Sequence, residues 1–214
     1  MKASALCVYN IGMEVYFLDL APLRGRLAEA MERLGPERRA RAVRLLREDA
    51  RLRSVGAGLL LARFFPGREP LFAPGGKPYF PGGRCLSLSH SGEAAVIALD
   101  DTDVGVDVQR LVSPRPALLR RVLTPGELAA LPTLGEDGFT VLWTRKEAVL
   151  KCLGVGMAGA FDSFSVLPGE PAVFGGAAFS LCSLRRGDCV ISTASAAGDA
   201  RFALRELRAE ELLG

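Results

Sequence analysis

Hydrophobic and polar positions divide the chain into strand-like and helix-like segments that alternate along its length. Residues 13–20 are rich in β-branched and aromatic side chains, which is typical of a strand. Between residues 36 and 65, apolar side chains recur at helical spacing, so this segment is predicted to be helical. Residues 66–84 contain many glycines and prolines, and we expect an ordered loop there with at most one brief strand.

Three short strands are predicted next, in a simple meander. Residues 86–89 alternate apolar and polar side chains, residues 94–99 form a short apolar run, and residues 104–108 alternate around Asp107. A second helical block follows these strands.

Local signals in the second helical block fix where its helices begin and end. Thr124 and Glu127 have the spacing of a capping box at a helix start. A long helix is expected over residues 139–153. It should end there because Gly154 suits the left-handed conformation that ends many helices. From Phe161 onward the pattern again indicates strands.

This order of elements predicts an α+β fold of two pseudo-repeated α/β halves, residues 1–103 and residues 104–214. In each half, helices are expected to pack on a small, mainly antiparallel sheet. The halves join near residues 100–110, an arrangement that places Asp107 and Glu147 in the cleft between them.

Composition limits the classes of protein to which the chain can belong. At 214 residues with 49% hydrophobic content, the chain can bury a sizeable core. A formal charge of +3 is too weak to indicate a nucleic-acid partner. No run reaches the roughly 18 uninterrupted apolar residues of a membrane helix, so we expect a cytoplasmic protein without a membrane partner. The five cysteines include no Cys-x-x-Cys pair and are predicted to be free thiols.

Positive charge is concentrated in one segment. Nine arginines fall between residues 33 and 63, against three acidic residues, so one face there is expected to attract anions. A solvated helix surface explains the same run equally well, and the run alone does not choose between them.

Trp143, Glu147 and Lys151 follow one another at intervals of four residues, so on a helix they project from one stripe. A Glu–Lys pair at this spacing is common on helix surfaces and contributes only about 0.2–0.5 kcal/mol. Trp143 on the same stripe indicates instead that this face is partly covered. The stripe therefore offers a carboxylate and an ammonium group for chemistry.

Asp107 lies between two valines in a predicted strand. A buried charge is costly unless it is paired or bound to a metal, so Asp107 is predicted to be a metal ligand, with a structural hydrogen bond as the alternative. Mg²⁺ is the natural ion, because it takes hard oxygen ligands and is commonly shared with substrate phosphates.

Residues 89–92 (Ser-His-Ser-Gly) bring hydroxyl, imidazole and backbone N–H groups together at a strand end, an inventory that suits phosphate oxygens. Lys77, which precedes Pro78, adds a cation, although either feature can be incidental. Residues 154–159 match the Gly-x-Gly-x-x-Gly pattern of dinucleotide-binding proteins, but they follow a helix and not a strand. A nucleotide-binding scaffold built on that stretch is therefore an alternative hypothesis only.

Four motifs, taken in chain order, resemble the signature set of the 4'-phosphopantetheinyl transferases. The resemblance is to the long, surfactin-synthetase-activating type and extends from about Pro36 to Val166. Four motifs in the right order and spacing are far more specific than any one of them. They are Gly76-Lys77-Pro78, Leu88-Ser89-His90-Ser91-Gly92, Gly105-Val106-Asp107-Val108 and Trp143-x-x-Lys146-Glu147-Ala148-x-x-Lys151.

The resemblance implies an enzyme whose two pseudo-repeated halves bind coenzyme A and a magnesium ion in the cleft between them. Family members transfer the 4'-phosphopantetheine arm of coenzyme A to a serine of an acyl or peptidyl carrier protein and release adenosine 3',5'-bisphosphate. We expect a monomer, because the internal duplication already supplies the cleft. Fatty-acid, polyketide and nonribosomal peptide synthesis are not distinguished as the pathway served.

The resemblance also implies roles for single residues. Asp107 and Glu147 would ligate the metal, with Glu147 also placed to take the serine proton. Lys151 would neutralise charge on the diphosphate. The coenzyme's phosphates and adenine end would be held by the remaining matched residues: Lys77, Pro78, Ser89, His90, Arg38, Arg41 and Arg53.

Gln109 departs from the family pattern, because many bacterial relatives of this type have Glu there as another metal ligand. Its neutral amide oxygen, or a water, would take that place. Activity is still expected, since two carboxylates and the diphosphate oxygens meet magnesium's modest demand for protein ligands. The alternative is a coenzyme A- or carrier-protein-binding module with weakened catalysis.

Overall fold

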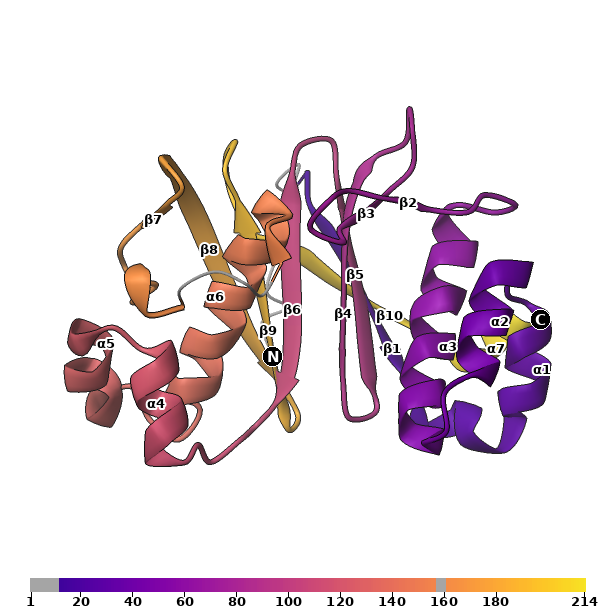
Figure 1. The fold of residues 1–214 in the computed structure, drawn as a ribbon, viewed down its shortest axis with the longest axis horizontal. Coiled ribbons are helices and arrows are strands. Elements are labelled where there is room, and N and C mark those ends of the chain that lie inside the picture. The colour runs from indigo at the N-terminus through magenta and orange to yellow at the C-terminus, as the bar shows by residue number, and fades with distance from the viewer. Residues whose placement is uncertain (1–11, 157–160) are drawn as a thin grey trace, which may run out of the picture.

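The chain forms two four-stranded sheets that stand side by side, with helices packed against each of them (Figure 1). The computed structural model describes residues 12–156 and 161–214; Cys7 and the last residues of the Gly-x-Gly-x-x-Gly stretch lie outside these ranges. The predicted α+β class is confirmed. Within the described ranges, no helix is long and apolar enough to span a membrane.

The first sheet is built from both ends of the chain. Its strand order is β10 (Ala203–Leu207), β1 (Glu14–Asp19), β5 (Ala94–Asp100) and β4 (Cys85–Ser91). β1 pairs parallel with β10 and antiparallel with β5, and β5 pairs antiparallel with β4. The chain therefore returns to its first half near its end, and the division at residues 103 and 104 remains a prediction.

Helices cover one face of the first sheet. They are η1 (Ala21–Arg26), α1 (Leu27–Glu32), α2 (Pro36–Val43), α3 (Glu48–Phe64) and α7 (Ala209–Leu213). In α3, Leu52, Val55 and Leu59 are buried at helical spacing and pack in one cluster with Leu18 and Ile97 of the sheet. A short hairpin of β2 (Leu71–Phe72) and β3 (Pro78–Tyr79) follows α3.

The second sheet is fully antiparallel, with the order β6 (Val104–Arg110), β9 (Cys189–Ser195), β8 (Ala177–Arg186) and β7 (Ala172–Phe174). Its helical elements are α4 (Pro116–Val122), α5 (Pro125–Ala130), η2 (Leu131–Thr133), α6 (Gly138–Leu153) and η4 (Phe161–Ser163). The capping box of Thr124 and Glu127 is confirmed at the start of α5. Gly154 ends α6 with a φ of 71°, the left-handed conformation predicted for it.

A shared apolar cluster joins the two sheets. Because side chains alternate along a strand, Ile97 of β5 faces the helices while its neighbour Val96 faces the second sheet. The cluster between the sheets includes Phe17, Val96, Ala98, Val106, Val108 and Ile191. This packing sets β4 of the first sheet beside β6 of the second.

The structure corrects two predictions in the first half. The helical segment 36–65 is interrupted, because α2 ends at Val43 and a new helix starts at Glu48, where acidic side chains favour a helix N-terminus. Segment 66–84 contains two short strands instead of at most one. The turn between them includes Gly76 at a φ of 84°, a conformation that glycine adopts readily.

Two further corrections concern the partners of strands. The predicted meander is wrong at its third strand, because β6 pairs with β9 of the second sheet and not with β5. Alternation identifies a strand but not its partner. Phe161 begins a 3-10 turn where the pattern predicts a strand, because its carbonyl and that of Phe164 accept hydrogen bonds from Lys146. β7 and α7 are additions that the pattern did not predict.

Candidate active site

A cavity of about 650 Å³ lies where the two sheets meet, and both halves of the chain line it. α2 and α3 contribute arginines, β4 and β6 contribute polar side chains, and α6 contributes a carboxylate and an ammonium group. All but one of the predicted site residues are found in this lining: Arg38, Arg41, Arg53, Pro78, Ser89, His90, Asp107, Gln109, Glu147 and Lys151.

The stripe on α6 faces this cavity, as its helical spacing predicts. Trp143, Glu147 and Lys151 all belong to the lining. The Trp143 ring stacks on Phe161 with 5.4 Å between ring centroids, so this end of the stripe is covered by the second half. The exposed Glu–Lys surface pair, which the sequence left open, is therefore excluded for Glu147, whose exposure is 5%.

Three polar atoms from both halves meet at one point. Lys151 Nζ lies 2.6 Å from Asp107 Oδ1 and donates to Ser89 Oγ at 2.8 Å. The Ser89 hydroxyl in turn donates to Asp107 Oδ1 at 2.6 Å. Ser89 belongs to β4 and Asp107 to β6, so this triangle connects the first sheet to the second.

Glu147 is buried without a complete set of partners. Its Oε1 atom has no hydrogen-bond partner among the described residues. Burial raises the pKa of Glu147 to about 7; the nearby Asp107 carboxylate adds to the rise, and Lys151 opposes it. A carboxylate in this state can hold a proton or release it near neutral pH, which suits a general base.

The same atoms fit a magnesium ion. An unpartnered, buried carboxylate oxygen beside a second carboxylate is a donor set that Mg²⁺ accepts, with phosphate oxygens and waters completing its shell. Gln109 lies two residues from Asp107 on the same strand face, and its Nε2 donates to the Arg110 carbonyl at 3.3 Å, which leaves the amide oxygen for another partner. Among the described residues there is no group of three or more His, Cys, Asp or Glu side chains around one point.

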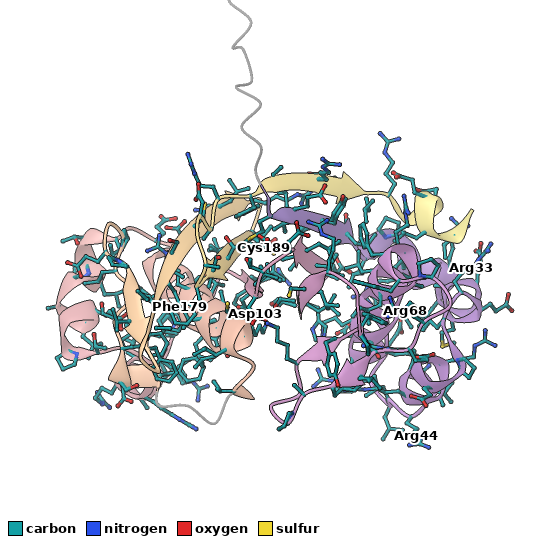
Figure 2. The ribbon with its side chains drawn as sticks, turned by 90° about the horizontal axis from the view of Figure 1, so that it is seen from above. Arg33, Arg44, Arg68, Asp103, Phe179 and Cys189 are labelled. Carbon is teal, nitrogen blue, oxygen red and sulfur yellow. The ribbon has the colours of Figure 1, made fainter. Side chains whose placement is uncertain are left out.

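Lys77 lies at a different place from the other predicted coenzyme ligands. Its Nζ donates to the Cys152 carbonyl near the end of α6 at 2.8 Å and pairs with Asp103 at 3.0 Å. Figure 2 shows Asp103 between the two halves of the molecule. In this arrangement Lys77 ties the β2–β3 hairpin to α6, and it lines a smaller cavity of about 200 Å³ that Glu147 and Lys151 also reach.

Six of the nine arginines in the arginine-rich segment fall into two groups. Arg38, Arg41 and Arg53 line the cavity, and burial, followed by repulsion from Arg41, lowers the pKa of Arg38. Two guanidinium groups that repel each other in this way favour an anion between them. Other members bind backbone carbonyls instead: Arg33 donates to Leu213, Arg39 to Met31 and Glu32, and Arg51 to Leu45.

His90 lines the cavity beside two cations. Desolvation by the surrounding protein lowers its pKa from the ordinary value of 6.5; Arg53 and Lys151 lower it further, and the Asp107 carboxylate opposes them. This shift favours the uncharged imidazole, which offers one donor and one acceptor for hydrogen bonds.

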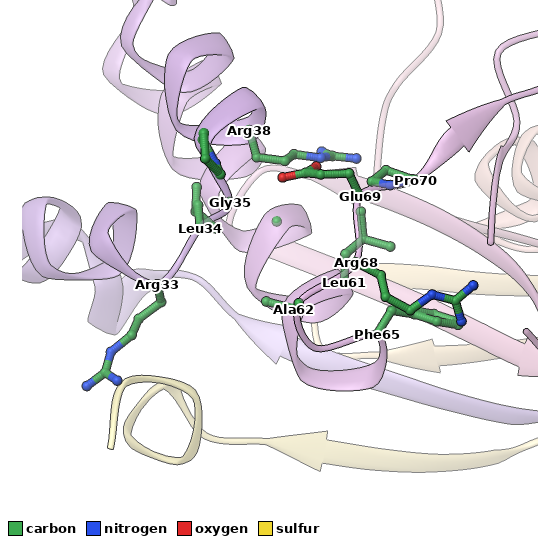
Figure 3. A pocket seen from close by; sticks show the side chains of 13 residues that line it. Arg33, Leu34, Gly35, Arg38, Leu61, Ala62, Phe65, Arg68, Glu69 and Pro70 are labelled. Atoms are coloured by element: carbon green, nitrogen blue, oxygen red, sulfur yellow. The ribbon is translucent and has the colours of Figure 1, made fainter.

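Arg38 also borders a second cavity of about 370 Å³, which lies between the start of α2, the C-terminal part of α3 and the loop that follows α3 (Figure 3). There the Glu69 side chain lies against Gly35, so close that a Cβ on Gly35 would fall 1.9 Å from a Glu69 carboxylate oxygen. Arg33 extends away from this cavity toward the C-terminal helix. None of the other predicted site residues lines it.

Sequence reasoning did not assign a role to Lys146, the neighbour of Glu147. Lys146 is fully buried, and its Nζ contacts Glu127 Oε2 at 2.9 Å and donates to the carbonyls of Phe161 and Phe164. Glu127 also accepts from the Val166 N–H at 2.9 Å. Its position in the sequence could have indicated a separate role. Lys146 lies one residue from the cavity-facing stripe, so on a helix its side chain points elsewhere.

Comparison with known proteins matches the chain to a family. Residues 103–194 match the 4'-phosphopantetheinyl transferase superfamily. The protein HetI of Nostoc sp., a 4'-phosphopantetheinyl transferase, is 32% identical over 162 residues, which cover 69% of this chain and 68% of HetI. The chain therefore belongs to the 4'-phosphopantetheinyl transferase superfamily.

Other relatives match over shorter segments. A 4'-phosphopantetheinyl transferase of Bacillus subtilis is 34% identical over 97 residues, or 42% of this chain and 43% of the relative. AcpT of Salmonella typhi, also a 4'-phosphopantetheinyl transferase, is 34% identical over 110 residues, or 47% of this chain and 57% of the relative. These matches span about half the length of each relative, and Asp107, Glu147 and Lys151 lie inside the segment that matches the superfamily.

Proposed function

We propose that the protein transfers the 4'-phosphopantetheine arm of coenzyme A to a serine of an acyl or peptidyl carrier protein in a magnesium-dependent reaction. The observation that carries this proposal is Glu147, a buried carboxylate with an unpartnered oxygen and a pKa raised to about 7, beside Asp107 and Lys151 in a cavity lined by arginines. Membership in the transferase superfamily supports it.

The cavity offers cations and a hydrogen-bonding imidazole that suit an anionic coenzyme. Arg38, Arg41 and Arg53 supply cations at one side, for the 3'-phosphate. His90 supplies a hydrogen bond for a phosphate oxygen, while the Ser89 hydroxyl donates to Asp107 and holds the Lys151 ammonium group. Attack on phosphorus requires positioning and charge neutralisation more than covalent help from the protein, and these side chains provide both.

Asp107 and Glu147 would hold the magnesium ion, with the Gln109 amide oxygen as a neutral third ligand. Bound there, the ion supplies positive charge to the diphosphate oxygens on which negative charge develops.

In the proposed reaction, the carrier serine Oγ attacks the phosphorus that bears the pantetheine group. A new O–P bond forms while the P–O bond to the adenosine side breaks, and adenosine 3',5'-bisphosphate leaves. Glu147, whose carboxylate lies at the cavity wall with one unpartnered oxygen, accepts the serine proton. Lys151 neutralises charge on the departing phosphate, and Ser89 and Asp107 hold its ammonium group in position. One chain supplies both sides of the cavity, so we propose that a monomer is active.

The test is incubation of the full chain with coenzyme A, Mg²⁺ and a panel of apo-carrier proteins, followed by mass spectrometry of each carrier. We expect one carrier to gain the mass of a single arm and an equal amount of adenosine 3',5'-bisphosphate to appear. Chelation of Mg²⁺ should stop both. Absence of any mass gain across fatty-acid, polyketide and peptide carriers contradicts the proposal.

Gln109 motivates a second candidate, a coenzyme A- or carrier-binding module with weak catalysis. A neutral amide replaces a carboxylate there, and no third acidic ligand is found among the described residues. Calorimetry separates the two proposals. Coenzyme A binding that is independent of Mg²⁺, together with no arm transfer, favours the module; binding that strengthens with Mg²⁺ favours the enzyme.

A further inference from the structure

The two sheets meet along strands that are both at the edge of their sheets. β4 ends the first sheet and β6 begins the second, and the two lie beside each other without forming a ladder of backbone hydrogen bonds in the described part of the chain. An edge strand leaves every second backbone N–H without a strand partner. For β6 these groups lie beside the cavity, so their partners determine how the two halves are held.

The direction of the β6 amides follows from the register with β9. The Leu111 N–H donates to the Asp188 carbonyl at 2.7 Å, which continues the β6–β9 ladder by one residue. Amides alternate in direction along an antiparallel strand. The N–H groups of Val106, Val108 and Arg110 therefore point away from β9, toward β4.

Serine hydroxyls on β4 accept hydrogen bonds from two of these three amides. The Val106 N–H donates to Ser87 Oγ at 3.0 Å, and the Arg110 N–H donates to Ser91 Oγ at 3.2 Å. Ser87, Ser89 and Ser91 alternate along β4, so all three face β6. The middle hydroxyl, Ser89 Oγ, instead joins the triangle with Asp107 and Lys151.

Helix α6 also holds β6 closely. A Cβ on Gly105 would fall 1.8 Å from the Ala148 carbonyl oxygen of α6, so the backbones of β6 and α6 are in direct contact there. β6 is thus held both by α6 and by the serines of β4. Asp107 lies between the two serine contacts, opposite Ser89.

We propose that Ser87 and Ser91 are positioning residues that fix the distance between the two halves of the cavity. Their hydroxyl groups replace a backbone ladder, one on each side of the point where Ser89, Asp107 and Lys151 meet. The proposal rests on the proposed function for its effect on rate. Because a displacement of about 1 Å can reduce a rate on the order of 100-fold, loss of either contact should lower kcat roughly 10- to 100-fold.

Amide hydrogen exchange tests the contacts directly. In the wild-type protein we expect slow exchange at Val106 and Arg110 and faster exchange at Val108, for which no acceptor is found among the described residues. In Ser87→Ala, exchange at Val106 should accelerate at least tenfold while Arg110 stays protected, and Ser91→Ala should give the reverse. Equal protection at both amides in both variants overturns the proposal.

Kinetics separate positioning from general stability. The matched control is Thr193→Val on β9, which removes a buried hydroxyl that donates to the Ala200 carbonyl but leaves the contact between β4 and β6 intact. We expect the control to keep kcat even where its melting temperature falls as far as that of Ser87→Ala. Ser91→Thr retains a hydroxyl at a partly exposed position and should restore the rate lost in Ser91→Ala.

Two outcomes contradict the positioning role: unchanged kcat in both alanine variants, or an equal loss of kcat in Thr193→Val. Failure of the proposed function looks different, because then the wild-type protein transfers no arm to any carrier. In that case the exchange pattern still decides whether Ser87 and Ser91 hold the two halves together, and calorimetric affinity for coenzyme A replaces kcat as the readout of positioning.

Discussion

Helix α6 carries two buried charged side chains in succession, and their surroundings differ. Lys146 has no exposed surface, and its ammonium group is surrounded by the Glu127 carboxylate, two backbone carbonyls and the Phe164 ring at 4.6 Å. Glu147 points the other way, into the cavity, with one oxygen unpartnered. The first side chain has a complete set of partners and the second does not.

This difference separates a group that stabilises the fold from a group prepared for a ligand. Burying an unpaired polar atom costs free energy, so native proteins satisfy nearly all such atoms. A buried carboxylate left unpaired at the wall of a cavity, with a pKa displaced to about 7, therefore indicates a site that a ligand completes. Lys146 shows that α6 is able to satisfy a charge fully where no ligand is needed.

The largest expected effect is on catalysis at Glu147. Glu147→Ala removes the proposed proton acceptor and the proposed metal ligand together, so kcat for arm transfer should fall roughly 10³- to 10⁴-fold. Stability should not fall in parallel, because the removed carboxylate is unsatisfied in the metal-free protein. Initial rates by mass spectrometry and urea unfolding of the same samples check both statements. If the variant keeps the full rate, Glu147 takes no part in the reaction.

Loss of the buried Lys146–Glu127 pair should reduce stability instead of catalysis. Glu127→Ala leaves the Lys146 ammonium buried without its counter-ion and also removes the acceptor for the Thr124 and Val166 amides. Breaking a buried pair on one side costs about 3–5 kcal/mol in the free energy of unfolding. Urea denaturation measures this loss, and Glu170→Ala, at an exposed position, serves as the control with about 0.5 kcal/mol or less. If the free energy of unfolding falls no more than in the control, the Lys146–Glu127 pair does not stabilise the fold.

The sequence predicted which side chains share a face better than it predicted how the strands around them pair. Helical spacing places Trp143, Glu147 and Lys151 on one stripe, and strand alternation places Asp107 and Gln109 on one face, because both periodicities are local properties of the backbone. Capping residues predicted the start of α5 and the end of α6 for the same reason.

Partners across the fold were not predictable in this way. The pattern of residues 104–108 identifies a strand, but its pairing with β9 depends on residues about 85 positions further along the chain. Lys77 was assigned to the coenzyme by motif, whereas its observed partners are Asp103 and the Cys152 carbonyl. The serine contacts between β4 and β6 likewise exist only once two distant strands lie side by side.

The raised pKa of Glu147 predicts a pH dependence of stability in the metal-free protein. Between the ordinary value of 4.5 and the folded value of about 7, the folded chain keeps a proton that the unfolded chain releases. The free energy of unfolding therefore falls as pH rises through this window, by about 3 kcal/mol in total. Glu147→Gln does not titrate and should lack this loss. Urea unfolding with a chelator at pH 4.5 and pH 8 measures the difference, and identical pH dependence in both proteins would contradict a raised pKa.

The smallest expected effect concerns Gln109, the proposed neutral metal ligand. Gln109→Glu adds a carboxylate on the same strand face as Asp107, so Mg²⁺ affinity should rise about tenfold, on the order of 1 kcal/mol. Without metal the added charge should raise the pKa of Glu147 further and lower stability at pH 8, because three carboxylates would then share one site. Gln109→Ala is the matched control, and metal titration by calorimetry compares the three proteins. Equal Mg²⁺ affinity in all of them would show that residue 109 does not contact the ion. The contrast with the fully partnered Lys146 would then rest on Glu147 and its neighbour Asp107 alone.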